Sequence, residues 1–485
     1  MDHVSRIRKN SLFTLLSQLV RLLTNLILFI GIARSYGVVE FGQFTSAHTL
    51  ATVFLVLADF GYDVLISSEI ARNRSRAREL AQTYLSMKLM TAFFAMGVMA
   101  LVAGLQDVSQ ATRTLMYVFC AYVLVSSLTN FFYALFRGLE EMHHETKISF
   151  LMNSLLLATV LLMGVAMVPL VFLAIAFVAS RVVGLLLVLA VVNKTLPLRE
   201  FRFTLARKAD FLLMGIFGTY AVFSALYFLQ DTILLSIWRG DHDAGIYQSV
   251  FKLIAVVCVI QEVVATALLP VLAHLHAEDQ LRWARTGNLM YRSLFLLGLM
   301  IALVFYVYAD QIITLVYGSK GFDEAIPVLR IFGFIVLIRF AGEPFGMMLT
   351  TSKRQSIRMA VVVVATVVNY CLNVYLIPSY GTVGAAYASL ITAILVGVGH
   401  ALPTRPFFRE WVFQTRVVVP LIATAAIGGV LWSLRAIPLW YTAPPALAVC
   451  GVVAYFVGYS EEERRFMLGR SGDGIDLKRK FRQMF

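Results

Sequence analysis

The sequence has little charge and few cysteines for its length. Charged residues make up 14% of the 485 residues, whereas an ordinary soluble domain carries about 25%. The four cysteines stand singly, so they predict neither a disulfide framework nor a metal site, and no cofactor is expected. No segment between the hydrophobic runs is long enough to bury a core of its own. These absences exclude a water-soluble enzyme and argue against a large catalytic head.

Hydrophobic residues dominate instead. They form 59% of the chain, and the mean hydropathy is +0.79. Because a bilayer core about 30 Å thick needs about 20 apolar residues per helix, we predict an all-α, polytopic membrane protein with fourteen transmembrane helices. The predicted spans are 11–33, 44–66, 85–105, 115–136, 148–168, 170–192, 211–237, 247–270, 289–309, 326–350, 359–377, 384–402, 416–434 and 444–459. The first is too long and too polar for a signal peptide, so we expect it to be retained.

The distribution of basic residues tests this helix count, since one missed helix would exchange the sides of every later loop. The loops and termini on the same side of the membrane as the N-terminus hold 29 Lys and Arg residues, and the loops on the other side hold five. Because basic loops stay in the cytoplasm, we predict that both termini are cytoplasmic. The net charge of +13 then reflects contact with anionic membrane lipids, and nucleic-acid binding is not expected.

An internal repeat is visible around two glycine turns. A shift of 203 residues aligns GVVEFG at 37–42 with GDHDAG at 240–245, and each turn leads to an aromatic residue, Phe44 or Tyr247. Seventeen residues beyond the second glycine of each turn lies a carboxylate, Asp59 or Glu262. The shift covers six predicted helices, an even number, so the halves share one orientation, as in transporters with parallel repeats. Glycine turns also recur by chance in polytopic proteins, and that alternative stays open.

The repeat predicts the domain organisation. We expect an N-terminal lobe at 1–193, a basic cytoplasmic linker at 194–210 and a C-terminal lobe at 211–403. Two further helices follow at 404–460, and a basic cytoplasmic tail at 461–485.

Seven basic residues remain inside the predicted spans after those of the loops and termini have been counted. A charge at mid-bilayer costs roughly 2.5 to 3.5 kcal/mol on insertion scales, so each deep charge is expected to face protein or water. Lys88, Arg292 and Arg330 stand near helix ends, and we predict that they snorkel to the interface. The deeper cations are Arg21, Arg181, Arg339 and, at an intermediate position, Lys252.

Helical spacing places further polar residues beside these charges. Steps of four, three and four residues put side chains on one helical face. In the first span this stripe is Thr14, Gln18, Arg21 and Asn25; in the span 211–237 it is Tyr220, Ser224, Tyr227 and Asp231. Interhelical hydrogen bonding is an alternative explanation of such stripes, and we favour it for Ser and Thr. For Arg21 and the carboxylates Asp59, Asp231 and Glu262 we favour a polar cavity.

The sequence resembles the polysaccharide transporter family of the multidrug/oligosaccharidyl-lipid/polysaccharide exporter superfamily, which includes O-antigen and exopolysaccharide repeat-unit flippases. The resemblance rests on YGVVEFGQF at 36–44 with LADFG at 57–61, GDHDAGIYQSVFKL at 240–253, and LNVYLIPSYGTVGAAYAS at 372–389. It implies two six-helix lobes with two extra helices, and alternating access to a central cavity. It also implies a flippase that moves a polyprenyl-diphosphate-linked oligosaccharide to the outer leaflet of the bacterial cytoplasmic membrane. A polysaccharide polymerase or export machinery would be a partner.

We therefore predict a substrate-binding site with no catalytic residue. The fork of an arginine binds two phosphate oxygens at once, so the diphosphate is assigned to Arg21, Arg339, Lys252 and Arg181. The sugars are assigned to amide and aromatic side chains, namely Gln18, Asn25, Tyr220 and Tyr227. Coupling to H⁺ or Na⁺ is assigned to Asp59, Asp231 and Glu262.

Two other functions stay open. A cation-coupled multidrug exporter of the same superfamily would handle amphipathic cations, and the deep basic residues argue against it. An integral-membrane glycan polymerase or ligase would need catalytic carboxylates or histidines in a substantial outer loop, and the predicted outer loops are short.

Overall fold

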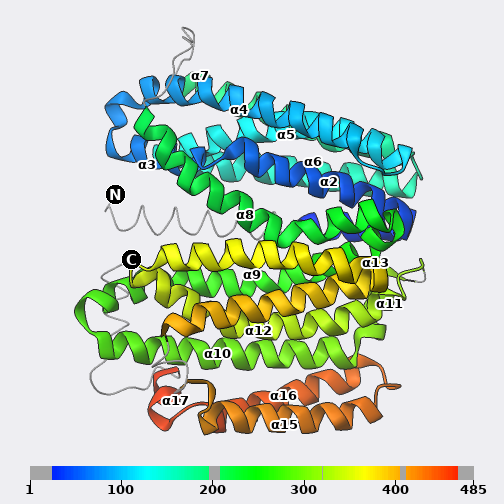
Figure 1. Cartoon of the computed structure of the whole chain (residues 1–485), viewed down its shortest axis with the longest axis vertical. Coiled ribbons are helices and arrows are strands. Elements are labelled where there is room, and N and C mark those ends of the chain that lie inside the picture. Colours follow the sequence, from blue (N-terminus) through cyan, green and yellow to red (C-terminus); the bar gives the residue numbers. More distant parts are fainter. Residues whose placement is uncertain (1–23, 196–207, 319, 405–410, 468–485) are drawn as a thin grey trace. The chain divides into compact units, whose positions relative to one another are not determined.

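The computed structural model describes residues 24–195, 208–318, 320–404 and 411–467. These residues are almost entirely helical and contain no strand (Figure 1). Twelve of their helices are long and apolar enough to cross a membrane. The prediction of an all-α, multi-pass membrane protein is therefore confirmed.

The helices of the first half begin with residues 24–36, which are helical up to the turn at Gly37. They continue with α2 (Val38–Asp59), α3 (Tyr62–Arg72), the 3-10 helix η1 (Arg74–Arg76), α4 (Ala77–Leu105), α5 (Gln110–Gly138), α6 (Met142–Val165), α7 (Leu170–Thr195) and α8 (Lys208–Trp238).

The second half contains both the longest helices and several short ones. These are α9 (Asp241–Glu278), α10 (Gln280–Val307), α11 (Ala309–Tyr317), α12 (Ala325–Thr351), α13 (Gln355–Ala401), η2 (Leu402–Thr404), α15 (Thr415–Ser433), α16 (Leu439–Gly458) and α17 (Glu461–Met467).

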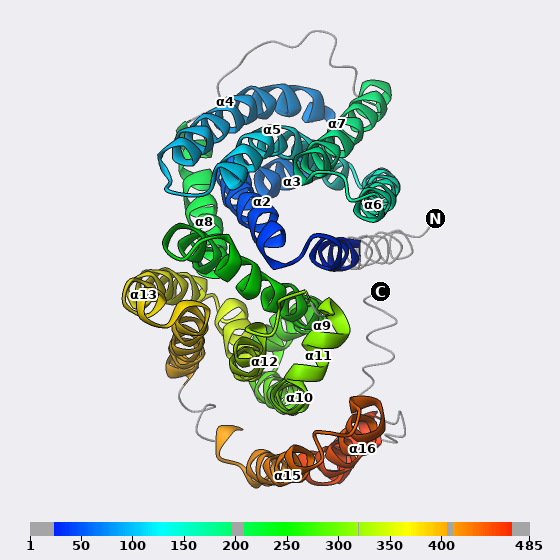
Figure 2. The same ribbon diagram turned by 90° about the vertical axis from the view of Figure 1, so that its right-hand side faces the viewer.

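The chain separates into two compact units, and the boundary between Gln248 and Ser249 lies inside α9. In unit 1, which ends at Gln248, α5 contacts α2, α4 and α7, and α8 packs on α2 (Figure 2). In unit 2, which starts at Ser249, α12 contacts both α10 and α13, while α15 and α16 contact α10. The six-plus-six division into lobes stays a prediction.

One predicted span is broken in the structure. The segment 44–66 was expected to be continuous, but α2 ends at Asp59 and α3 begins at Tyr62. Phe60 and Gly61 both have positive φ, of 31° and 81°. A glycine adopts that conformation without steric cost, so the LADFG sequence ends the helix. The break places Asp59 at a helix terminus.

The predicted spans 359–377 and 384–402 both fall within α13, whose 47 residues form two helices that meet at a kink. Gly381 interrupts α13 with φ 55° and ψ −132°, which are not helical values. Dividing α13 there gives thirteen spans within the residues that the structure describes. The remaining predicted span, 11–33, lies largely outside them, although its residues from 24 onward are helical.

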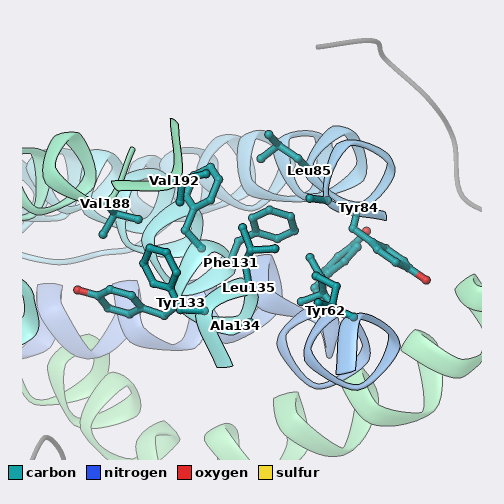
Figure 3. Close-up of a cluster of buried hydrophobic side chains, with 14 of the residues drawn as sticks. Tyr62, Tyr84, Leu85, Phe131, Tyr133, Ala134, Leu135, Val188 and Val192 are labelled. Atoms are coloured by element: carbon teal, nitrogen blue, oxygen red, sulfur yellow. The ribbon is translucent and has the colours of Figure 1, made fainter. Parts of the chain in front are cut away.

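An aromatic core fixes one end of unit 1. Tyr62 of α3, Tyr84 of α4 and Phe131 of α5 are buried together with Val188 and Val192 of α7 (Figure 3). Between membrane helices, such side chains stabilise the contact by close van der Waals packing, because the surrounding lipid is as apolar as the core. This core holds α3 and α5 against α4 and so aligns the charged residues described next.

Candidate functional site

The two glycine turns of the repeat have matching backbones. Gly37 and Gly240 both have a φ of 92°. The amide of Phe41 donates to the Gly37 carbonyl at 3.1 Å, and that of Ala244 donates to the Gly240 carbonyl at 3.3 Å. Equivalent hydrogen bonds at a shift of 203 residues are a structural counterpart of the sequence repeat.

These turns also pack directly on each other within unit 1. A Cβ atom at Gly42 would overlap the carbonyl oxygen of Asp241 and lie 2.9 Å from the Gly245 nitrogen. A Cβ atom at Gly245 would overlap the carbonyl oxygen of Val38 and lie 3.1 Å from the Gly42 nitrogen. The second glycine of each turn is thus required by the backbone of the other turn.

Buried polar residues lie next to this contact. Asp231 of α8 is 1% exposed and accepts a hydrogen bond of 2.5 Å from the Tyr247 hydroxyl. The Gln248 amide donates to Thr49 at 3.0 Å and to Thr232 at 2.8 Å, linking α9 to α2 and α8. Asp231, predicted to couple an ion, is therefore held by a tyrosine, and its coupling role stays a prediction.

The second predicted coupling residue, Asp59, lies in a cluster of charged and polar side chains that we call the Asp59 cluster. Its Oδ1 accepts from Lys88 Nζ at 2.6 Å and from the Ser127 hydroxyl at 2.9 Å. Its Oδ2 accepts from Asn130 at 2.9 Å, and Asp63 Oδ1 lies 3.8 Å from Lys88 Nζ. Helices α2, α3, α4 and α5 each contribute a member.

The prediction that Lys88 and Arg292 snorkel to the interface is wrong. Lys88 is 0% exposed and paired with Asp59. Arg292 of α10 is also buried; it donates to the Gly458 carbonyl at 2.7 Å and is ion-paired with Glu463. Each cation has an anionic partner within reach, so neither needs to extend to water. Arg330, in contrast, is partly exposed and stands over the Trp432 ring at 5.1 Å.

Arg181 is the predicted phosphate ligand of unit 1 that the structure describes. It lies near the middle of the span Leu170–Lys194, and its guanidinium carbon stands 5.3 Å from the centre of the Phe177 ring. Its Nε is buried and has no hydrogen-bond partner among the described residues. Asn25 and Tyr227, predicted to contact sugars, are half-buried in unit 1, and Tyr227 packs edge-on against Phe228.

The structure does not describe the side chains of three predicted site residues. Gln18 and Arg21 precede the described residues. Tyr220 belongs to α8, but its side chain is not described.

The predicted residues of unit 2 lie on α9 and α12. Lys252 is half-buried, whereas Glu262 is exposed. Arg339 of α12 is half-buried, and both it and Glu262 lie close enough to Cys258 of α9 to act on it electrostatically. Arg339 therefore lies beside the stretch of α9 that carries Cys258 and Glu262.

Unit 2 also contains a group of polar residues that the sequence reasoning missed, which we call the Glu343 cluster. Gln261 of α9 donates to Glu343 Oε2 of α12 at 2.9 Å, and Arg358 of α13 approaches Glu343 Oε1 at 3.4 Å. Arg358 also donates to Thr350 at 3.1 Å. His400, at the far end of α13, completes the cluster.

Gly346 leaves room for this arrangement. A Cβ atom there would lie 3.3 Å from His400 Nδ1 and 3.4 Å from Arg358 Nε. The signal that could have revealed the cluster is Glu343 itself, a carboxylate inside the predicted span 326–350. Arg358 stands one residue before the predicted span 359–377, so the apolar pattern places it in a loop.

The fold is shared with solved transporters. A lipid II flippase, MurJ, in an inward closed conformation matches with a TM-score of 0.70 at 14% identity, over 95% of this chain and 99% of that one. An inward-facing multidrug resistance MATE family transporter of the MOP superfamily matches with a TM-score of 0.67 at 15% identity, over 80% and 96%. The class is thus a polytopic membrane protein with the MOP superfamily fold.

The chain belongs to the polysaccharide biosynthesis protein family, whose sequence profile matches residues 7–276, more than half of its length. The MatE profile matches residues 217–375. The "probable low-salt glycan biosynthesis flippase Agl15" of Haloferax volcanii is 22% identical over 226 residues, which are 45% of this chain and 47% of that protein. The chain thus spans about half the length of this curated relative. The resemblance noted in the sequence is confirmed.

Proposed function

We propose that this protein is a flippase that moves a polyprenyl-diphosphate-linked oligosaccharide from the cytoplasmic to the outer leaflet by alternating access. Its place would be the bacterial cytoplasmic membrane, with both termini in the cytoplasm. A head group with about two negative charges that moves outward gains about 2.3 kcal/mol per charge per 100 mV when the inside is negative. The membrane potential would therefore favour export.

Two kinds of relative support this proposal. The chain belongs to a polysaccharide biosynthesis family, and Agl15 is described as a probable glycan biosynthesis flippase. MurJ, which shares the fold, is described as a lipid II flippase. The lipid-linked glycan, a coupling ion (H⁺ or Na⁺) and a polymerase or export partner belong to the proposal.

The observation that carries the proposal is the state of Arg181. A guanidinium near the middle of a membrane helix is costly unless an anion or water meets it. The Phe177 ring meets the cation from one side, but the buried Nε has no hydrogen-bond acceptor among the described residues. A diphosphate oxygen would supply that acceptor, and arginine binds phosphate in two-pronged fashion. We assign Arg181 to the head group, and Arg339, Lys252 and Arg21 to the same role.

A flipping assay tests this assignment. The full chain would be reconstituted in vesicles with a fluorescent polyprenyl-diphosphate-linked disaccharide, and an impermeant quencher added outside would report transfer. Because a hydrogen bond to a charged group contributes about 1.5–3 kcal/mol, Arg181→Gln should slow transfer about tenfold or more. Arg72→Gln, which removes the same charge at an exposed position, should keep the rate. Undiminished transfer by Arg181→Gln removes that residue from the site, and no transfer by the wild type refutes the proposal.

Cation-coupled drug export is the second candidate function, and the MatE match over residues 217–375 favours it. This alternative predicts that the reconstituted protein transports ethidium against a pH or Na⁺ gradient. The positive charge of Arg181 near the middle of its span argues against it, because a cationic drug would be repelled there. Ethidium transport without glycan transfer would decide for this alternative.

A further inference from the structure

The Glu343 cluster joins three helices of unit 2 through one carboxylate. Its carboxylate is shared by two donors from two other helices, Gln261 of α9 and Arg358 of α13. We propose that Glu343 and Arg358 form a proton-exchange site, in which protonation of the Glu343 carboxylate releases the Arg358 guanidinium. The coupling of this site to transport rests on the proposed flippase function.

The geometry of the pair allows it to open. Glu343 Oε1 and Arg358 Nη2 are 3.4 Å apart, longer than the 2.7–2.9 Å of a strong charge-assisted hydrogen bond. Their side chains are 19% and 26% exposed, so neither is sealed in the core. Arg358 has a second acceptor, the Thr350 hydroxyl at 3.1 Å, which would hold the guanidinium when the carboxylate is neutral.

An acceptor for the added proton is already in place. Gln261 is 7% exposed, and while its amide nitrogen donates to Glu343, its Oε1 is buried without a hydrogen-bond partner among the described residues. A protonated carboxyl becomes an O–H donor. A rotation of the Gln261 amide would therefore turn the present bond around, with Glu343 donating to Gln261 Oε1. Gln261 Oε1, which is unpartnered now, would then accept a hydrogen bond, while Gln261 Nε2 would give up its bond to Glu343.

His400 offers a second buried atom of this kind. It is 6% exposed, and its Nε2 has no hydrogen-bond partner among the described residues. Its Nδ1 and the Arg358 Nε border the same space beside Gly346. An imidazole can both accept and donate a proton, so His400 would pass protons toward the pair. By the predicted topology, this end of α13 faces the cytoplasm.

The neighbouring charges favour a proton over a metal ion. A metal cation would need several oxygen ligands, whereas the groups that now contact Glu343 are both donors. Other titratable or charged groups on the packed elements are Arg339 of α12, Glu262 and Cys258 of α9, and Tyr291 of α10, which packs against Phe345. Arg339 and Arg358 would repel a divalent ion. One proton passes from a hydronium ion, which becomes water, to the Glu343 carboxylate. One O–H bond breaks and one forms, and the charge of the pair rises from zero to plus one.

Infrared difference spectroscopy tests proton uptake without any glycan. The full chain in lipid nanodiscs would be compared at neutral and acidic pH, and the C=O stretch of protonated carboxyl groups recorded. The wild type should gain a component that Glu343→Gln lacks and that Glu343→Asp shifts. Glu278→Gln, an exposed carboxylate at the end of α9, should retain it. If Glu343→Gln keeps every component of the wild-type band, or Glu343→Asp leaves the band unmoved, the proton site is refuted.

A transport measurement separates this site from the proposed function. With the fluorescent polyprenyl-diphosphate-linked disaccharide, an imposed pH gradient should accelerate wild-type transfer and leave the rate of Glu343→Gln unchanged. Wild-type transfer that ignores the gradient overturns the coupling and leaves the flippase intact. Absence of transfer beside an intact infrared component refutes the flippase and retains the proton site.

Discussion

The Asp59 cluster of unit 1 and the Glu343 cluster of unit 2 both bring a carboxylate and a cation together on membrane helices, but they are built differently. Asp59 receives three hydrogen bonds of 2.6 to 2.9 Å, and its lysine is fully buried. Glu343 receives one bond of 2.9 Å and a longer contact of 3.4 Å from a partly exposed arginine. The first carboxylate is saturated with donors, although Oδ1 of the neighbouring Asp63 has no hydrogen-bond partner among the described residues. Beside the second carboxylate, the unpartnered atoms are Gln261 Oε1 and His400 Nε2.

This difference separates a structural ion pair from a mobile one. A buried pair is stable only when short bonds replace the lost water, and the Asp59 cluster meets that requirement with Ser127 and Asn130. A partly exposed pair with a long contact contributes little stability. The Glu343 cluster can therefore change its bonding at small cost, which a proton-exchange site requires.

The largest expected effect on the free energy of unfolding comes from removing the cation of one cluster, and it tests whether the two clusters differ. Lys88→Met leaves the Asp59 carboxylate buried without its counter-charge, and such a loss costs about 3–5 kcal/mol. Arg358→Met should cost less than about 1 kcal/mol, because its pair is partly exposed. Equilibrium unfolding in mixed micelles measures both.

A double variant checks the assignment. Adding Asp59→Asn to Lys88→Met should recover most of the lost stability, because the uncompensated charge is gone. Equal losses for Lys88→Met and Arg358→Met would show that the two clusters are equivalent.

The next largest effect comes from the two glycine turns. Like the Asp59 cluster, their contact in unit 1 is tightly packed and leaves no room for change. Gly42→Ala and Gly245→Ala each force a Cβ atom into the opposite backbone, and overpacking costs typically about 1–3 kcal/mol. Gly97 of α4 is the matched control, since a Cβ atom there meets nothing within 4 Å. Gly97→Ala should be neutral or stabilising by up to about 1 kcal/mol, as expected inside a helix. Equal thermal stability of all three variants would contradict the contact.

The helices and the repeat were predictable because they depend on local pattern. Apolar runs separated by charged turns defined the spans, and the two glycine turns at a shift of 203 residues have matching backbones. The break after Asp59 could not be predicted, because a single glycine inside an apolar run can either continue a helix or end it. Its conformation is fixed by tertiary packing around Tyr62, which the sequence does not display.

The partners of the charged residues could not be predicted. In the sequence, Lys88 stands near a predicted helix end. Only the packing of α2, α4 and α5 shows that its ammonium group is paired with Asp59. The apolar run places Arg358 in a loop, but α13 begins at Gln355, because a membrane helix can extend past its apolar run by a turn of polar residues. Glu343 needed contacts among α9, α12 and α13 to stand out. Contacts between helices far apart in the sequence thus decide which charged residues are paired and which can change partners.

The smallest predicted effect concerns the ion pair between Arg292 of the membrane-spanning helix α10 and Glu463 of α17, which follows the last span. Burial raises the pKa of Glu463, but hydrogen bonds from Arg292 and Ser460 outweigh it and hold the pKa below its ordinary value of 4.5. A lowered pKa means that the stabilisation is complete above pH 4.5 and is lost as the pH falls through the folded-state pKa.

Glu463→Gln should therefore flatten the decline of the unfolding temperature below pH 4.5, with a free-energy difference of at most about 1 kcal/mol, since the carboxylate is only half-buried. Glu461→Gln, an exposed carboxylate on the same helix, should keep the acid slope of the wild type. An unchanged slope in Glu463→Gln would mean that the pair behaves like the loose Glu343–Arg358 contact. A flattened slope would place it between the two clusters, since a buried cation is met there by an accessible anion.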